Sequence, residues 1–301
     1  MRNIKKEPLV SVVMPVYNGS KYIAEATDSI LNQTYKNFEL LIVDDGSTDD
    51  SWEIIQDYKQ RFPNIIRIFK LEKNCGAFNA TNFLIGHAKG KYLAPMDSDD
   101  VSRHDRLLKQ VSFLENSPEV IVLGTQANII NENGEYVGIK KLPLDHKKIY
   151  EEFGVFHPLV HPSCMIRRSA LPDQNRLYNI KYGVNDDYYT FFSLLTKGKF
   201  ANLEECLLSY RIHFKNSSLT NVKGKFLNSL KIRLEAANKF GYKLSLKCLL
   251  LMAIQTVVVL PIPSKYVLYL YLIVKGIYAP QNIFTKFVPK VDMAPTLSRT
   301  A

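Results

Sequence analysis

The chain has 301 residues, of which 46% are hydrophobic and 23% charged; this composition is typical of a folded protein and excludes a disordered one. Its formal net charge of +10 arises from residue 223 onward, where twelve Lys or Arg accompany two acidic residues. These charges flank apolar runs and form no single polar stripe, so the pattern favours an anionic lipid partner over nucleic acid.

The first 124 residues alternate predicted strands with predicted helices. Short apolar runs indicate buried strands, and apolar residues at helical spacing separate them. The predicted strands are 9–14, 38–43, 65–69, 91–94 and 120–123, and the predicted helices lie around 22–30, 52–58, 78–88 and 107–114. This alternation predicts an α/β fold with a mostly parallel sheet and helices on both faces. Ligands of such sheets lie beyond the carboxyl ends of the strands.

The pattern changes after Gly124. Asn133 and Gly134 between two short runs predict a hairpin. Residues 140–185 show no regular period, and a helix over 186–196 and a short strand over 207–212 follow.

The end of the chain is basic and apolar. Residues 244–260 and 266–278 are apolar runs separated by a Pro-Ile-Pro sequence. The first run has seventeen residues, fewer than the ~20 that span a bilayer. Helices lying in the membrane interface are favoured, while a hairpin through the bilayer and ordinary core or dimer packing stay open. We therefore expect a catalytic domain over 1–220 and a membrane-associating helical tail over 221–301.

The cellular setting follows from two further observations. The four cysteines stand singly without metal-finger spacing, which indicates a reducing compartment. No apolar leader precedes Leu9. We expect a peripheral or monotopic protein on the cytoplasmic face of the cell membrane.

Three acidic clusters follow predicted strands or open a predicted helix, at residues 44–50, 97–100 and 186–187. Carboxylates packed this closely repel one another unless a cation or hydrogen-bond donors compensate them. Asp97 and Asp99 are spaced to present oxygens to one hard cation, Mg²⁺ or Mn²⁺. Taken singly, the clusters also fit a turn with a helix cap, a solvated loop, and the acidic start of a helix.

The clusters and their neighbours resemble a known family when taken in order. The segments are SVVMPVYN at 11–18, VDDGSTD at 43–49, NCG at 74–76 with Asn82, DSDD at 97–100, DD at 186–187 and YRIH at 210–213. They are similar to the successive motifs of family 2 glycosyltransferases with the GT-A fold, over residues 8–220. The resemblance implies an inverting enzyme that uses a nucleotide-diphosphate sugar, with UDP favoured, and a divalent cation.

The resemblance also implies roles on the donor side. Pro15, Tyr17 and Asp45 border the nucleotide base, and Asp45 accepts a hydrogen bond from it. Asn82 is placed among the donor-binding residues. Thr81 stands where the family often has a basic residue, a departure that affects the diphosphate contacts of that loop.

Further roles concern the metal and the acceptor. Asp97 and Asp99 match the DxD motif, with Asp99 as the direct metal ligand and Asp97 as a ribose or metal contact. His213 is expected near the diphosphate or the metal. Asp187 matches the base that removes the proton of the acceptor hydroxyl, and Asp186 replaces the commoner Glu beside it.

The predicted function is therefore transfer of a sugar to a glycan or lipid-linked acceptor, in synthesis of a capsule, lipopolysaccharide or exopolysaccharide. No QxxRW-like segment follows Asp187, which argues against a processive synthase. Two alternatives stay open at this point. One is another metal-dependent phosphate-handling enzyme, such as a nucleotidyltransferase or a phosphohydrolase, and the other is a non-catalytic membrane scaffold on the same fold.

Overall fold

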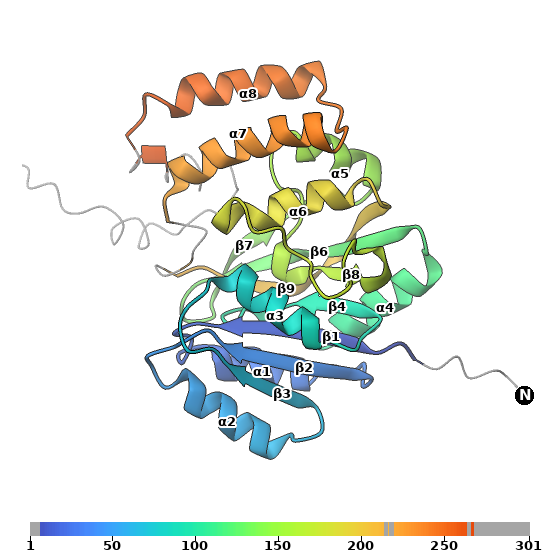
Figure 1. The fold of residues 1–301 in the computed structure, drawn as a ribbon, viewed down its shortest axis with the longest axis vertical. Helices are drawn as coiled ribbons and strands as arrows, with labels where there is room; N and C mark the ends of the chain where they lie inside the picture. The colour runs from blue at the N-terminus through green and yellow to red at the C-terminus, as the bar shows by residue number, and fades with distance from the viewer. Residues whose placement is uncertain (1–6, 214–215, 217–219, 264–265, 268–301) are drawn as a thin grey trace, which may run out of the picture.

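The computed structural model describes residues 7–213, 216, 220–263 and 266–267 (Figure 1). The strands are β1 (Val10–Val16), β2 (Phe38–Asp44), β3 (Ile66–Lys70), β4 (Tyr92–Pro95), β5 (Val101–Ser102), β6 (Val120–Ile130), β7 (Tyr136–Lys140), β8 (Met165–Arg167) and β9 (Lys199–Arg211). The α-helices are α1 (Ile23–Leu31), α2 (Ser51–Arg61), α3 (Ala77–His87), α4 (Arg106–Asn116), α5 (His146–Phe153), α6 (Asp186–Leu194), α7 (Val222–Lys239) and α8 (Leu246–Val259).

Within these residues the strands form one nine-stranded sheet in the order β3-β2-β1-β4-β8-β6-β9-β5, with β7 paired to β6. The four strands β3, β2, β1 and β4 are parallel, as predicted. Their carboxyl ends therefore lie at one edge of the sheet, and the first two acidic clusters follow β2 and β4 at that edge.

The other half of the sheet corrects the prediction of a mostly parallel sheet. β8 runs antiparallel to both β4 and β6, and β5 runs antiparallel to β9. β7 forms the predicted hairpin with β6, while β6 and β9 are parallel. The sheet is thus mixed. β8 has only three residues, and so short a run carries no period from which its direction could be predicted.

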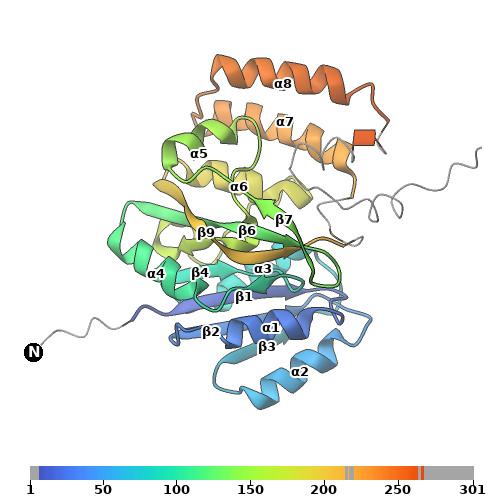
Figure 2. The same cartoon turned by 180° about the vertical axis from the view of Figure 1, so that it is seen from behind.

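Two core clusters cover the two faces of the sheet. In β1, Val10, Val12 and Met14 pack with α1, α2 and α4, whereas Val13 packs with α3, α5, α6 and α7. Figure 1 shows α3 in front of the sheet, and Figure 2 shows α1 in front on the opposite face. Both faces are buried because the strands carry apolar side chains at consecutive positions.

The segment 140–185, predicted to be irregular, contains α5 and β8. Asp145 begins α5, and its side chain accepts a hydrogen bond from the N–H of Lys148. The strand predicted over 207–212 is also longer than expected, because β9 starts at Lys199 and pairs with β6 over most of its length.

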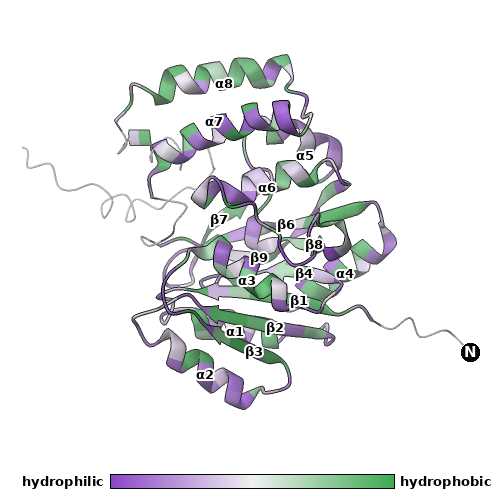
Figure 3. Cartoon of the chain, viewed as in Figure 1, coloured by the Kyte–Doolittle hydropathy of each residue, from purple (hydrophilic) through white to green (hydrophobic). Residues whose placement is uncertain are grey.

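Helices α6, α7 and α8 lie one beyond another on the side of the sheet that carries β6 (Figure 1). Ile232 and Ala236 of α7 are buried in the same core as α6. α8 is mostly hydrophobic (Figure 3), yet many of its large apolar side chains are exposed. None of the described helices has the length and apolar character needed to cross a membrane. The predicted apolar run over 266–278 lies outside the described residues from position 268 onward.

Candidate active site

The first acidic cluster follows β2 and forms hydrogen bonds to a neighbouring loop, residues 73–76. Asp45 is buried, and its two carboxylate oxygens accept hydrogen bonds from the N–H groups of Cys75 (2.8 Å) and Gly76 (3.0 Å). Gly46 has a φ of 72°, and a Cβ there would lie 2.8 Å from the backbone N of Asn74. The turn therefore requires glycine so that residues 73–76 can approach Asp45.

The three other residues predicted to bind the donor, Pro15, Tyr17 and Asn82, lie in different surroundings. Pro15, near the end of β1, lines a large cavity, and Tyr17 lies just beyond the strand with 51% of its surface exposed. Asn82 is turned toward another segment. Its Nδ2 donates to the carbonyl of Tyr178, and its Oδ1 accepts from the N–H groups of Leu177 and Tyr178. These contacts make Asn82 an anchor for residues 177–178 in this structure.

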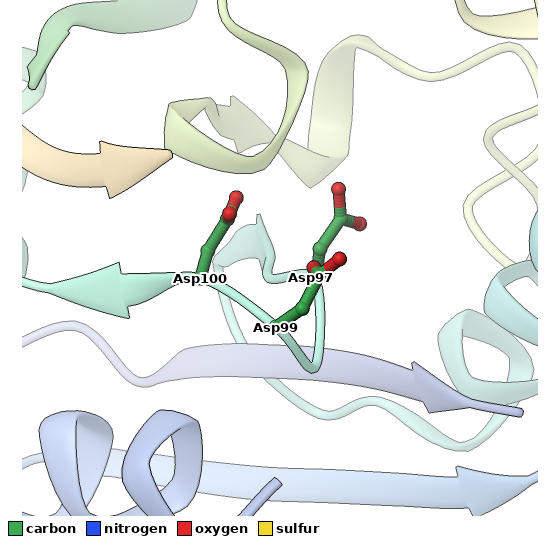
Figure 4. Close-up of side chains that lie close together, drawn as sticks. All are labelled: Asp97, Asp99 and Asp100. Atoms are coloured by element: carbon green, nitrogen blue, oxygen red, sulfur yellow. The ribbon is translucent and has the colours of Figure 1, made fainter. Parts of the chain in front are cut away.

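The second acidic cluster follows β4 and gathers three carboxylates (Figure 4). One ligand oxygen from each of Asp97, Asp99 and Asp100 lies within 4.8 Å of the others. Burial and the negative charges of Asp99 and Asp187 raise the pKa of Asp97 to about 7. The Oδ2 of Asp100 is buried without a hydrogen-bond partner in the described part of the chain. Repelling carboxylates with an unused oxygen fit a hard divalent cation, which takes oxygen ligands.

His213 lies beside this group. Its Nε2 is 2.8 Å from the Oδ2 of Asp99, and the Nδ2 of Asn216 donates to the same oxygen (3.3 Å). The ring of His213 also packs against Tyr22, with 5.1 Å between the ring centroids. The structure thus brings His213 to the predicted metal ligand Asp99, with the ring nitrogen directed at the carboxylate.

Arg211 holds the same loop, and sequence reasoning assigned it no role. It is buried; its backbone N–H donates to Asp100 Oδ1 (2.8 Å), and its Nε donates to the carbonyl of Asp99 (2.8 Å). Its Nη2 forms an ion pair with Glu25 at 2.5 Å. The segment YRIH at 210–213 contained this residue, but only the pairing of β9 with β5 shows what it contacts.

The third acidic cluster begins α6, and its two members have different surroundings. Asp186 is buried, and its Oδ1 accepts hydrogen bonds from the N–H groups of Lys181 (2.8 Å) and Tyr182 (2.5 Å). The Oδ2 of Asp187 lies 3.5 Å from the Nε2 of His157. Burial raises the pKa of Asp187 to about 6. Asp186 therefore holds the preceding loop, whereas Asp187 presents a carboxylate that can take up a proton near neutral pH.

One cavity of about 670 Å³ joins these parts. Pro15, Gly76 and Asp97 line it on the side of the parallel strands, and Asp187 lines it from α6. Lys140, at the end of β7, also lines it; burial lowers the pKa of this amine, while the carboxylate of Asp187 acts in the opposite direction. The sequence did not indicate a role for Lys140, because a single lysine at the end of a predicted hairpin belongs to no motif. Acidic residues 90 positions apart in the chain thus face the same space.

Comparison with known proteins gives the family of this chain. Residues 11–173 match the family model described as glycosyl transferase family 2. The O-antigen biosynthesis glycosyltransferase WbnJ of Escherichia coli is 37% identical over 216 residues, which cover 69% of this chain and 82% of the relative.

Solved structures share the fold. A fragment of TarS of S. aureus (residues 1–349, in complex with UDP) superposes with a TM-score of 0.61 at 19% identity, over 81% of this chain and 69% of that fragment. The mannosyltransferase PcManGT of Pyrobaculum calidifontis, in complex with GDP-Man and Mn²⁺, gives a TM-score of 0.57 at 17% identity, over 94% and 89% of the two chains. The α/β architecture is therefore the expected GT-A-like one. With the match over more than half of its length, the chain belongs to glycosyl transferase family 2.

Proposed function

We propose that this glycosyltransferase moves a sugar from a nucleotide-diphosphate donor, with UDP favoured, to a hydroxyl of a glycan or lipid-linked acceptor, with inversion at the sugar. We place the reaction in cell-surface glycan synthesis. The name of the E. coli relative supports this setting, and the UDP complex of TarS supports the class of donor. No nucleic acid takes part.

The observation that carries the proposal is that Asp97 and Asp187 line one cavity from different elements. On the donor side, Pro15, Tyr17 and Asp45 border the base at the carboxyl ends of β1 and β2. Asp45 holds residues 75–76 against this edge through its two amide hydrogen bonds. Asn82 supports the donor side indirectly, by anchoring residues 177–178.

Asp99 and Asp97 would hold a divalent cation, Mn²⁺ or Mg²⁺, with His213 positioning the carboxylate of Asp99. When bound, such a cation neutralises the charge that develops on a departing diphosphate. The Mn²⁺ in the structure of the mannosyltransferase supports the assignment. Repulsion among the carboxylates of Asp97, Asp99 and Asp100 favours cation binding, because the ion relieves it.

Asp187 acts as the base. Its pKa of about 6 leaves the carboxylate ionised at neutral pH and still basic enough to accept the proton of the attacking hydroxyl. The acceptor attacks the face of the sugar opposite the leaving diphosphate, so one base suffices for a single inverting displacement. Lys140, which lines the same space, opposes the build-up of negative charge there.

In this proposal residues 1–220 carry the reacting side chains, and the range 221–301 contains the segment that attaches the enzyme to the cytoplasmic face of the membrane, as a peripheral or monotopic protein. Support comes from the exposed apolar side chains of α8 and from the basic residues that flank them. A membrane-bound enzyme gains effective concentration when its acceptor lies in the same surface.

A donor screen tests the reaction. The purified chain is incubated with UDP-, GDP- and dTDP-sugars, with Mn²⁺, with Mg²⁺ or with EDTA, and the nucleotide product is identified. We expect a nucleoside diphosphate to be released from one donor class, and only with a divalent cation. Release of inorganic phosphate or pyrophosphate instead would indicate the phosphate-handling alternative, and no turnover of any donor would support the scaffold alternative.

A further inference from the structure

Residues of α7 and α8 also line the cavity. These two helices lie farther from β4 than α6 does (Figure 1). Lys225, Ser229 and Arg233 of α7 are four residues apart, so they share one side of the helix, and all three line the cavity. The carboxylates among the described lining residues belong to Asp97 and to the pair at 186–187. The cavity therefore carries these three carboxylates together with Lys140, and α7 adds two further basic side chains.

Arg233 is a buried cation whose charge no described carboxylate balances. It is 3% exposed, and its Nε donates to the hydroxyl of Tyr188 (3.1 Å). Its two other nitrogens donate to Gln255 Oε1 (3.1 Å) and to the carbonyl of Val155. All three acceptors are neutral, and the described residues place no acidic side chain within ion-pair distance. A buried charge held only by neutral groups is energetically unfavourable, so an anion entering the cavity would be attracted to it.

Lys225 lies two turns earlier on α7 and also lines the cavity. Val222 and Phe226 of the same helix pack with Val259 and Val267, and all four line the cavity. Burial lowers the pKa of Lys225 to about 8. Lys225 thus adds a second basic side chain to the part of the cavity that Arg233 and these apolar residues line.

We propose that the α7 face of Lys225, Ser229 and Arg233 is a subsite for a phosphate-type oxyanion of the acceptor, with an apolar group of the acceptor against the wall at Val222 and Phe226. The inference rests on the proposed function, which places the acceptor in this cavity. The hydrogen bond of Arg233 to Tyr188, the residue after Asp187, connects the subsite to the proposed base. The reacting hydroxyl would then lie between the two.

A phosphate or diphosphate fits this face better than a sugar carboxylate. Eight residues of helix separate the Cα atoms of Lys225 and Arg233 by about 12 Å. A diphosphate offers oxygens to both side chains and to the hydroxyl of Ser229, and its charge matches two cations. A carboxylate has two oxygens and one charge. A soluble sugar phosphate and a lipid-linked diphosphate share this chemistry, and the apolar wall beside Lys225 allows an experiment to separate them.

Binding of a short prenyl diphosphate tests the subsite. Farnesyl diphosphate, inorganic diphosphate and farnesol are titrated by calorimetry into the full chain in EDTA, so that no cation connects the probe to Asp97 and Asp99. We expect farnesyl diphosphate to bind and Lys225→Gln to weaken binding about tenfold, as loss of a charge-assisted contact does. Lys231→Gln, which removes an exposed lysine of the same helix, is the matched control and is expected to leave the affinity unchanged.

A second variant addresses Arg233, whose removal would also disturb packing. Arg233→Lys keeps the charge but loses the planar array of donors, so we expect binding weakened several-fold. The melting temperature of the variant is measured alongside, so that weaker binding by the folded protein is distinguished from unfolding. Inorganic diphosphate binding as tightly as the farnesyl compound would point to a soluble phosphate, and weaker binding would point to a lipid-linked one. Either ranking supports the oxyanion subsite, but equal binding contradicts the apolar contact at Val222 and Phe226.

The inference is overturned if wild type and Lys225→Gln bind farnesyl diphosphate equally, if farnesol binds as tightly as its diphosphate, or if neither diphosphate binds. The titration contains no donor and no metal. Its failure therefore leaves a positive donor screen intact, and a failed donor screen does not remove the binding.

Discussion

Asp187 is the residue on which the proposed reaction depends most directly. Asp187→Asn keeps the shape of the side chain but cannot accept a proton, so we expect sugar transfer to fall by about 10²–10⁴-fold. Binding of the donor with Mn²⁺ is expected to be unchanged, because Asp187 lies on the acceptor side. The measurement is steady-state transfer together with donor titration, and Asp57→Asn, on the exposed side of α2, is the control. Normal transfer by Asp187→Asn would contradict the assignment of the base.

The same carboxylate predicts a pH dependence. Burial raises the pKa of Asp187 to about 6, so the protonated, inactive form grows as the pH falls through that value. We expect kcat to be constant above about pH 7 and to decrease tenfold for each pH unit well below 6. The profile is recorded at saturating donor and Mn²⁺. A rate that stays constant down to pH 5 would show that another group takes the proton.

For Asp186, which is adjacent to Asp187 in the sequence, we predict an effect on stability instead of an effect on the reaction. Its Oδ1 accepts the two amides that fix residues 181–182 before α6. Asp186→Ala removes both acceptor contacts, and we expect the free energy of unfolding to fall by about 2–3 kcal/mol. Asp186→Asn retains the Oδ1 acceptor and is expected to lose less. Denaturant unfolding of the two variants measures the difference, and equal losses would show that these hydrogen bonds contribute little.

At the scale of single elements, the sequence predicted the half of the sheet whose strands have a clear pattern. β1, β2 and β4 are rich in apolar residues, and the carboxyl ends of β2 and β4 carry the acidic residues as expected. The resemblance to the family indicated that Asp187 belongs to the same site. The mixed direction of the other half was not predictable, because β8 and β5 have three and two residues and their pairing is fixed only by tertiary contacts.

Three parts of the site also depend on contacts that no local pattern encodes. Lys140 reaches the cavity because β7 pairs with β6, and Arg211 reaches Asp100 because β9 pairs with β5. The two amides that bind Asp45 come from a loop 30 residues away in the chain. Asn82 is a different case: its motif position predicts a donor contact, which stays a prediction, and its side chain hydrogen-bonds to residues 177–178 in this structure.

The exposed face of α8 is an element with a pattern of its own. Leu246, Leu250, Ile254 and Val257 are spaced to share one side of the helix, and each is more than half exposed. An exposed apolar stripe of this kind marks a surface for a membrane or another protein. The basic residues Lys243 and Lys247 near its start favour an anionic membrane.

At the scale of the whole molecule, this stripe predicts how the enzyme distributes between solution and membrane. We expect the chain to sediment with vesicles of phosphatidylcholine and phosphatidylserine. The double variant Leu250→Glu, Val257→Glu is expected to lower the partition coefficient at least tenfold, because it removes two apolar side chains that would be buried in the membrane. Leu108→Glu, at an exposed apolar position of α4, is the matched control. Unchanged sedimentation of the double variant would show that another surface binds the vesicle.

The buried position of Arg211 has a consequence for how the protein opens. Through its backbone and its side chain, this one residue of β9 contacts the loop after β4 and Glu25 of α1. These segments therefore cannot separate independently, and the backbone amides of Asp100 and Arg211 are expected to exchange with deuterium through one shared opening event. We then expect Mn²⁺ to slow the deuterium exchange of both amides by the same factor. The exchange rate of the Arg211 amide in β9 would therefore report whether a cation is bound at Asp97, Asp99 and Asp100, although β9 contains none of these carboxylates.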